Sequence, residues 1–487
     1  MNGKPYLVVS AEGLPRLSLE AWAEATLARV EAGARLVSMF GRPDQAGVVV
    51  TSVLEGDGLV VIRGVGGAGA SYPALTPRHS PAQHFEREIW EQTGLVPAGH
   101  PWLKPIRYQG ARQREMSSYP FYRLEGKEVH EVGVGPVHAG VIEPGHFRFM
   151  CFGEKVHHLE IQLGYQHRGV EALLKEKPLR ALAPLVETIA GDSSVAQAWA
   201  HAQAVEALLG QSLDPDTALV RGIALELERI AMHLASLAGL ATDIAFLQGA
   251  SSYGRIRTAA INASMRVCGS RFGRSWIRPG GVRFPITSAR AEDLAKTLAA
   301  MADDLYDVDA LMLEAQTVRA RFAGVGAVDA ETARAIGMVG MAARASGRLL
   351  DLRTNLPGAP YTSRAIPMVV EPSGDCWARM RVRQREIGAS IAWIRAALAE
   401  ARPLGAPLPA PAPLPPHALA ISLIEAHRGE LMHAIETGAE GEIIHYKVQD
   451  PSLKNWFGLA LALRHNEISD FPICNKSFDL SYAGNDL

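Results

Sequence analysis

Hydrophobic and polar residues follow two different rhythms along the chain, and the change of rhythm divides it in two. Three short runs in the first part are rich in Val and Ile and predict β-strands: 36–40, 47–54 and 59–64. Residues 19–33 instead have apolar positions three to four apart, with Ser18 in a capping position, and predict a helix. Residues 1–125 are therefore predicted to form a small α/β domain.

Helical spacing dominates the second part. Asp214-Pro215 is typical of a helix start, and apolar residues from Leu219 to Ile244 then recur every three or four positions. Further helices are predicted at 289–322, 329–350 and 375–401, a proline-rich linker at 402–416 and a strand at 442–448. The predicted fold class is α+β, with the small α/β domain followed by a large, mainly α-helical domain, 126–487.

Charged residues also occur on the predicted helix that follows Pro215. Glu226, Arg229 and His233 lie three and four positions apart, so their side chains share one helix face. Pairing between helices or at the surface explains them without a catalytic role.

Composition excludes several classes of function. The net charge of -2 gives no general attraction for nucleic acid, and none is expected as a partner. The four cysteines are widely spaced, without a Cys-x-x-Cys pair, so the chain alone has no local motif for an iron–sulfur cluster or a thiolate zinc site. Neither a signal peptide nor an uninterrupted apolar span is expected, which favours a peripheral, cytoplasmic protein.

Titratable residues gather among glycines between residues 135 and 194. His138 lies in the loop GPVHAG, and His167, Arg168 and Glu171 lie in LGYQHRGVE, before an Ala-rich helix. Such crowding indicates a site where backbone and ligand approach closely, although solvated loop histidines explain it equally well.

The motifs HRGxE, RPGGV (278–282) and Glu-x-x-Arg-Gly-Glu (425–430) make the chain similar to a known superfamily. They resemble the large subunits of [NiFe] hydrogenases and their metal-free relative, the D subunit of NADH-quinone oxidoreductase, or respiratory complex I. The segment HFEREIWEQTGLVPAGHPWLKPI (84–106) resembles the C subunit of complex I. The two in this order resemble hydrogenase-4 and formate-hydrogenlyase-type large subunits.

The resemblance implies where a nickel–iron centre would have its four thiolate ligands. Here those positions hold other residues: Ala190, Ser193, Ser481 and Gly484. Serine hydroxyls are poor substitutes for soft thiolates. We therefore expect no metal and no NiFe site on this chain. Cys474 lies near the motif but off the ligand positions, and is expected to be a buried apolar side chain.

The resemblance to complex I implies a quinone pocket instead. His138 and Asp243 match its polar residues, and a carboxylate that orients an imidazole is chemically suited to protonating a quinone. The family's tyrosine and arginine positions, however, hold Gly191 and Thr188. Quinone is thus a possible ligand. We expect this chain alone to hold no cofactor.

Three further residues match positions at a subunit interface in these families. His167, Arg168 and Glu171 are expected to move protons or to contact a partner there, and an Arg168–Glu171 ion pair is the structural alternative. The implied partners are a small iron–sulfur protein like the B subunit of complex I, whose clusters supply electrons, and membrane subunits. NAD and quinone binding are implied for the assembly. A non-catalytic scaffold and a true hydrogenase large chain remain alternatives.

Overall fold

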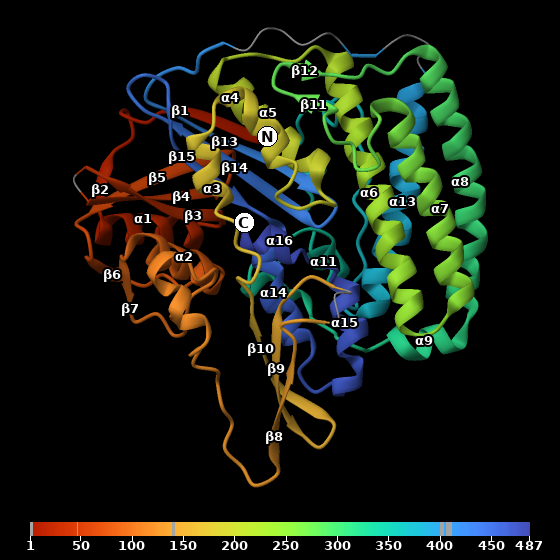
Figure 1. Ribbon diagram of the computed structural model, residues 1–487, viewed down its shortest axis with the longest axis horizontal. Helices are drawn as coiled ribbons and strands as arrows, with labels where there is room; N and C mark the ends of the chain where they lie inside the picture. The colour runs from red at the N-terminus through yellow and green to blue at the C-terminus, as the bar shows by residue number, and fades with distance from the viewer. Residues whose placement is uncertain (1–2, 46, 139–141, 400–403, 406–411) are drawn as a thin grey trace.

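The computed structural model describes residues 3–45, 47–138, 142–399, 404–405 and 412–487. A sheet-rich half lies beside a bundle of long helices, and a narrow three-stranded sheet projects from the body between them (Figure 1). The mixed α+β fold class predicted from the sequence is confirmed.

The N-terminal sheet contains the three predicted strands and one short strand, β2 (Arg16–Ser18), that was not predicted. Its spatial order is β2, β5 (Leu59–Gly66), β4 (Gly47–Glu55) and β3 (Arg35–Asp44). Helix α1 (Leu19–Glu31) starts at Ser18, whose hydroxyl accepts a hydrogen bond from Ala21 N. The helix lies directly on β5, because Cβ atoms at Gly64 and Gly66 would lie only 2.6 and 2.3 Å from Trp22 and Leu19. Beside this sheet lie α2 (Gln83–Thr93) and the strand pair β6 (Ser71–Pro73) and β7 (Val96–Ala98).

A second sheet joins the two ends of the chain. Its order is β1 (Tyr6–Ser10), β13 (Ala418–Ala426), β14 (Gly429–Thr437) and β15 (Ile443–Gln449), and every neighbouring pair is antiparallel. The first strand therefore leaves the N-terminal α/β unit and pairs with a strand more than 400 residues later. Helix α5 (Ser194–Leu208), which is buried along nearly its whole length, packs on β13 and β14.

The long helices form the other half. They are α6 (Pro215–Asp243), α7 (Leu247–Cys268), α8 (Ser288–Glu314) and α13 (Cys376–Leu398). Asp214 caps α6 by accepting Thr217 N at 2.9 Å, as its Asp-Pro start predicts. No helix of the described residues is long and apolar enough to cross a bilayer.

Two predicted helices are shorter than expected. The segment 289–322 breaks at Ala315 into α8 and α9 (Gln316–Phe322). The segment 329–350 forms only α10 (Ala330–Ala335) and α11 (Gly340–Ala345), because the glycines at 337 and 340 adopt positive φ. Most of the predicted linker 402–416 lies outside the described residues.

The residues of the predicted charged helix face lie in the core. Glu226 accepts hydrogen bonds from Arg229, Arg353, Tyr361 and Ser390, and all are buried. His233 pairs with Glu386 of α13 at 2.7 Å. The sequence left two alternatives for these charged residues, pairing between helices and pairing at the surface. Pairing between helices is confirmed, and the paired residues are buried.

The projecting sheet consists of β8 (Val129–Val134), β9 (His146–Phe152) and β10 (Lys155–Gln162), with β9 in the middle. Short elements complete the fold: η1 (Ser80–Ala82), η2 (Gly110–Met116), α3 (Val170–Glu176), α4 (Leu179–Val186), β11 (Ile277–Arg278), β12 (Gly281–Val282), α12 (Leu352–Asn355), α14 (Pro451–Ala462), η3 (Ile468–Asp470), α15 (Phe471–Phe478) and α16 (Tyr482–Asp486).

Candidate functional site

Two segments that are far apart in the sequence meet beside α5, and Arg168 holds them together. Its guanidinium donates to the carbonyl oxygens of Thr188 and Ile189, both at 2.8 Å, and to that of Ala483 at 3.3 Å. The loop that carries Ala190 and Ser193 is thereby fixed beside the C-terminal segment that carries Ser481 and Gly484.

These four positions do not fit a nickel–iron group. Ala190 has no donor atom, and Ser481 Oγ already accepts the backbone N–H of Gly484 at 2.9 Å, as the cap of α16. At Gly484 a Cβ atom would lie 2.6 Å from the carboxyl carbon of Asp450, so a cysteine there would collide with it. Across the described residues, no group of three or more His, Cys, Asp or Glu side chains is arranged to hold a metal ion.

An ion pair lies beside these positions. Arg428, in the tight turn between β13 and β14, makes a two-pronged contact with Asp192 at 2.8 and 2.5 Å, and its Nε donates to the carbonyl of Asp479. Burial opposes the charge on Arg428, but the carboxylates of Asp192, Asp479 and Asp450 outweigh it and raise its pKa. Burial likewise opposes ionisation of Asp192, and Arg428 nevertheless lowers the pKa of that carboxyl. Both groups are charged at neutral pH.

The turn that presents Arg428 requires two glycines. Gly429 has φ +136° and Gly340 has φ +64°, and a Cβ at Gly340 would lie 2.1 Å from the carbonyl oxygen of Arg428. The backbone of α11 therefore touches the hairpin directly and fixes the position of Arg428.

Asp243 lies at the end of α6, near the same cluster. Its side chain is largely exposed, but partial desolvation, together with the negative charge of Asp479, raises its pKa to about 6 against the opposing charge of Lys476. Lys476 donates to Asp479 at 2.8 Å, and its aliphatic chain lies on Gly239 of α6. The carboxyl of Asp243 therefore gains and loses a proton close to neutral pH.

Glu143 lies next to this cluster, in the connection between β8 and β9. Burial, with the negative charge of Asp192, raises its pKa, and its Oε2 accepts the N–H of Tyr482 at 3.3 Å. The site therefore combines an arginine cation, two ionised aspartates and two carboxyls, those of Asp243 and Glu143, that hold a proton more readily than usual.

His138 does not meet Asp243. Its half-buried ring bonds through Nε2 to the carbonyl oxygen of Gly145 at 2.9 Å and packs against Phe147. Among the described contacts no hydrogen bond joins it to Asp243, whose charged neighbours are Lys476 and Asp479. The described contacts thus place Asp243 in a different charge cluster from His138, and a joint role of the two residues stays a prediction.

The HRGxE residues hold the backbone together. His167 Nδ1 bonds to the carbonyl of Asp486 at 2.8 Å, while Arg168 makes the three contacts described above. Glu171 is not paired with Arg168; it accepts from Lys447 of β15 at 2.8 Å and from Gln92 of α2 at 3.1 Å. The alternative of an Arg168–Glu171 pair is wrong, since α3 turns Glu171 toward the N-terminal unit.

Sequence reasoning missed five residues of this site, one of which is Glu143. Arg428 lies in the Glu-x-x-Arg-Gly-Glu motif, and Asp192 and Asp479 each lie within two positions of an expected ligand position, yet nothing in their spacing shows that they meet. His427, beside Arg428, is also buried, and neither of its ring nitrogens has a hydrogen-bond partner among the described residues. Burial and the charge of Arg428 hold the pKa of His427 well below its usual value, so it is a neutral imidazole.

Cys474 is buried, as expected, and adjoins another thiol. A Cβ built on Gly326 would lie 2.6 Å from its Sγ and 3.6 Å from that of Cys376. Arg379 donates to Cys376 Sγ at 3.4 Å, and Cys376 Sγ donates to Ser477 Oγ at 3.5 Å.

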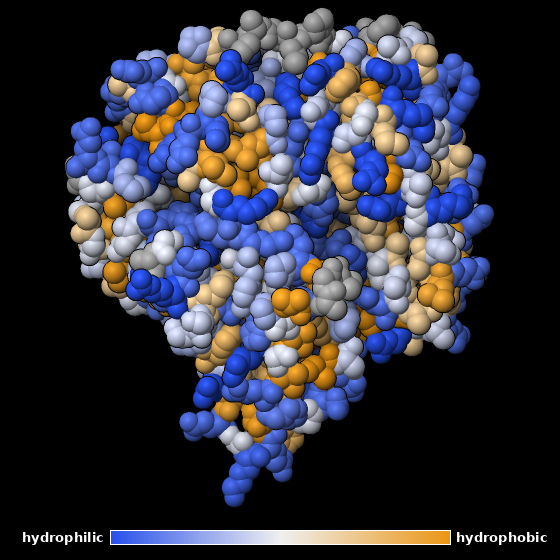
Figure 2. All heavy atoms as spheres, in the orientation of Figure 1, coloured by the Kyte–Doolittle hydropathy of each residue, from blue (hydrophilic) through white to orange (hydrophobic). Residues whose placement is uncertain are grey.

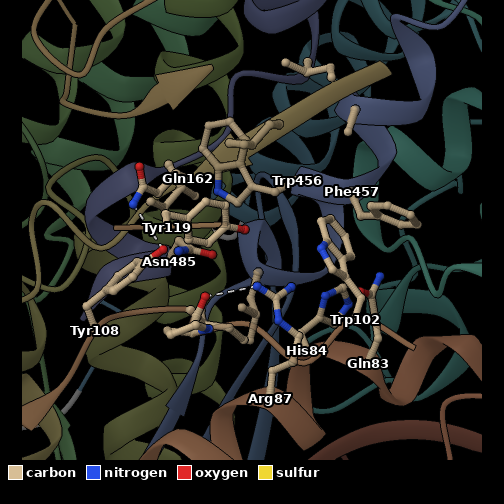
Figure 3. Close-up of a pocket in the computed structure, with 17 residues that line it drawn as sticks. Gln83, His84, Arg87, Trp102, Tyr108, Tyr119, Gln162, Trp456, Phe457 and Asn485 are labelled. Carbon is tan, nitrogen blue, oxygen red and sulfur yellow. Dashed lines mark hydrogen bonds between the residues drawn. The ribbon is translucent and has the colours of Figure 1, made fainter. Parts of the chain in front are cut away.

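A separate small pocket lies between α2 and α14 (Figure 3). Tyr108, Tyr119, Trp102 and Trp456 line it, and Arg87 is held by the carbonyl oxygens of Lys104 and Pro105. Its volume of about 70 Å³ is far below the several hundred Å³ of typical organic-ligand sites. We therefore place the candidate site at the Asp192–Arg428 cluster.

Comparisons with known proteins agree with this architecture. Residues 243–413 match the family described as "Respiratory-chain NADH dehydrogenase, 49 Kd subunit". Hydrogenase-4 component G of Escherichia coli (strain K12) is 28% identical over 438 residues, covering 85% of this chain and 76% of that protein. The D subunit of NADH-quinone oxidoreductase from Carboxydothermus hydrogenoformans is 30% identical over 333 residues. The alignment covers 68% of this chain and 87% of that protein.

A solved structure shares the fold. A chain from the membrane-bound sulfane sulfur reductase, an archaeal respiratory membrane complex, aligns with a TM-score of 0.69 at 22% identity, over 75% of this chain and all of that one.

The family follows from the sequence identity to the D subunit, which extends over most of the length of that subunit. The chain belongs to the family of the D subunit of NADH-quinone oxidoreductase, and its residues 243–413 match the 49 kDa-subunit family model.

Proposed function

We propose that this chain is a metal-free, peripheral subunit of a membrane-bound, complex I-like oxidoreductase of the hydrogenase-4 type. In this proposal it assists electron transfer from iron–sulfur clusters of a partner protein toward quinone, and handles the accompanying protons. Its relatives are named as components of hydrogenases and of NADH-quinone oxidoreductase, which supports the assembly type.

One observation supports the proposal: an acid–base cluster adjoins positions 190, 193, 481 and 484, which the resemblance matches to the metal ligands of a hydrogenase. Ala190 and Gly484 offer no donor and no space for a thiolate, while the adjoining Asp192–Arg428 pair is intact. A charged site without metal ligands suits proton transfer and binding of a polar organic molecule better than hydrogen chemistry.

In this proposal one residue supplies protons to the quinone and another supplies a fixed positive charge. A quinone accepts two electrons and two protons when it is reduced. Asp243, with its pKa of about 6, supplies or relays a proton near neutral pH, and Arg428 provides a fixed positive charge for a developing anion. The role of His138 in quinone binding stays a prediction. Its half-buried ring bonds to the carbonyl oxygen of Gly145. If it contacts quinone, H138A should weaken quinone binding.

Exposed apolar residues support a partner on this side. Val137, in the GPVHAG loop, and Ile142, shortly after it, are 75% and 45% exposed. Figure 2 shows hydrophobic residues gathered at the base of the projecting β8–β10 sheet, on the face that carries this loop. We propose that a small iron–sulfur protein docks there, with membrane subunits below it and the whole chain on the cytoplasmic side of the membrane.

The test is quinone reduction by the purified native complex carrying D243N. We expect the rate to fall about tenfold or more, and D243E to restore most of it, because only the proton-carrying group is changed. D303N, at an exposed position of α8, is the matched control and should keep the wild-type rate. A wild-type rate in D243N would remove Asp243 from the mechanism.

A scaffold role is the second candidate, and the HRGxE contacts favour it. His167, Arg168 and Glu171 all bind backbone or bridge the two units of the chain, which is structural work. If D243N and H138A both leave quinone reduction unchanged while the assembly stays intact, the scaffold function is the better description.

A further inference from the structure

A large cavity on a different part of the molecule lies where the N-terminal unit meets the α10–α11 region. It has a volume of about 440 Å³ and is lined by the turn between α1 and β3, by residues 78–81, and by residues 334–339 and 348–350. This volume is within the range of small-molecule sites, and the cavity is open to solvent. It shares no lining residue with the Asp192–Arg428 cluster.

The cavity wall is cationic. Its seventeen lining residues include no Asp or Glu, and five carry a positive charge: Arg35, Arg78, Arg334, Arg348 and Lys454. Carboxylates behind the wall pair with three of these. Arg35 contacts Glu55 and Glu430, Lys454 shares Glu430, and Arg78 contacts Glu24 and Glu31.

Two guanidinium groups are left over. Within the described part of the chain, the side chains of Arg334 and Arg348 have no acidic or hydrogen-bonding partner. The Nε atom of Arg348 is buried without an acceptor, and the Nε2 atom of His79, in the same wall, is also buried and unpartnered. Burial and the positive charges of Arg334 and Arg35 lower the pKa of Arg348. An unpaired, partly desolvated guanidinium such as that of Arg348 is costly beside like charges, and a bound anion removes that cost.

Most of the remaining lining residues are apolar. The hydrophobic members of the lining are Val30, Ala34, Leu36, Pro81, Ala335, Met338, Val339 and Leu350. A cavity with two free guanidiniums and an apolar wall fits a molecule with a doubly charged head and an organic body. Arginine forks match phosphate oxygens in geometry, and a phosphate monoester carries close to two negative charges at neutral pH.

We propose that this cavity binds an organic phosphate monoester of about mononucleotide size, with its phosphate on Arg334 and Arg348 and its organic part on the apolar wall. The proposal is independent of the quinone site. The ordinary surface alternative, two solvated arginines, does not explain why Arg348 Nε and His79 Nε2 are buried without partners.

Calorimetric titration of the purified full-length chain tests this. The probes are adenosine monophosphate, inorganic phosphate and adenosine. We expect adenosine monophosphate to bind, inorganic phosphate to bind at least tenfold more weakly and to compete with it, and adenosine to give no detectable binding. Affinity should fall as salt rises, since the contact is largely ionic.

The variants locate the site. R348Q should weaken adenosine monophosphate at least tenfold and R334Q, which is more exposed, about threefold to tenfold. R180Q, on an exposed face of α4 away from the cavity, removes the same charge and should stay within twofold of wild type. R348Q breaks no hydrogen bond, so its melting temperature without ligand should not fall.

Three outcomes would overturn the proposal. They are no binding of adenosine monophosphate to the wild type, equal weakening by R348Q and R180Q, and unchanged binding in R348Q. Equal affinities for inorganic phosphate and adenosine monophosphate would overturn the claim that the cavity binds the organic portion of the ligand. The cavity would then be a site for inorganic anions.

Discussion

Replacing Arg428 by glutamine tests the ion pair at the centre of the candidate site. The side chain of Arg428 is 6% exposed and that of Asp192 is 36% exposed. Removing one partner of a fully buried pair costs about 3–5 kcal/mol, whereas an exposed pair contributes about 0.2–1 kcal/mol. Because Asp192 is partly solvated, we expect R428Q to lower the free energy of unfolding by about 2–3 kcal/mol.

Two comparisons separate the pair from general effects. R428K keeps the charge but reaches only one carboxylate oxygen, so about 1–2 kcal/mol should be lost. R255Q breaks another Arg–Asp pair, with Asp304, whose side chains are 64% and 37% exposed. That control should cost less than about 0.5 kcal/mol.

The assay is urea unfolding followed by tryptophan fluorescence, with D192N and the D192N/R428Q double variant completing a double-mutant cycle. The structure predicts a coupling energy of about 1.5–2 kcal/mol between Asp192 and Arg428. Additive effects, or a cost for R428Q no larger than that for R255Q, would refute the reasoning that this pair is a partly buried, two-pronged contact.

Two further changes test the surroundings of the site. G340A should destabilise the protein by about 3 kcal/mol or more, because a Cβ there meets the carbonyl oxygen of Arg428. The control is G254A, at a helical glycine whose Cβ would have no atom within 4 Å, and it should be neutral or slightly stabilising. Equal melting temperatures for the two variants would contradict this packing. E228Q tests pH dependence at Glu228 of α6, whose buried carboxyl accepts the backbone N–H groups of Val195 and Ala196 at the start of α5. Burial raises the pKa of Glu228 to about 8, above its unfolded value of 4.5, so the stability that its proton contributes is complete below pH 4.5 and is lost as the pH rises through 8. Wild type should therefore lose more unfolding free energy than E228Q between about pH 5 and pH 9, and parallel curves would contradict the raised pKa.

Local sequence signals predicted local structure well. The Ser18 cap and the Asp214-Pro215 start are decided by groups within a few residues, and both helices begin where expected. The prediction of one helix over 329–350 failed because its helical spacing does not reveal that Gly337 and Gly340 adopt positive φ. Gly337 packs on the ring of Pro81, and Gly340 packs on the backbone of Arg428 and Gly429. A periodic pattern carries no information about such contacts.

The site depended almost wholly on long-range contacts. The sequence identified the loops with 190, 193, 481 and 484, but it paired His138 with Asp243 and missed Arg428. Arg428 meets Asp192 across 236 positions, and β1 pairs with a strand at the other end of the chain. Resemblance named the right segments, while only the folded chain showed which charges face one another.

The measurement that tests the central claim most directly is metal analysis of the purified native complex, with nickel and iron counted per copy of this chain. The account predicts no nickel, and iron only in the amount that the clusters of partner proteins require. Stoichiometric nickel that remains with this chain would contradict the account. It would mean that side chains other than those at 190, 193, 481 and 484 hold a hydrogenase-type centre.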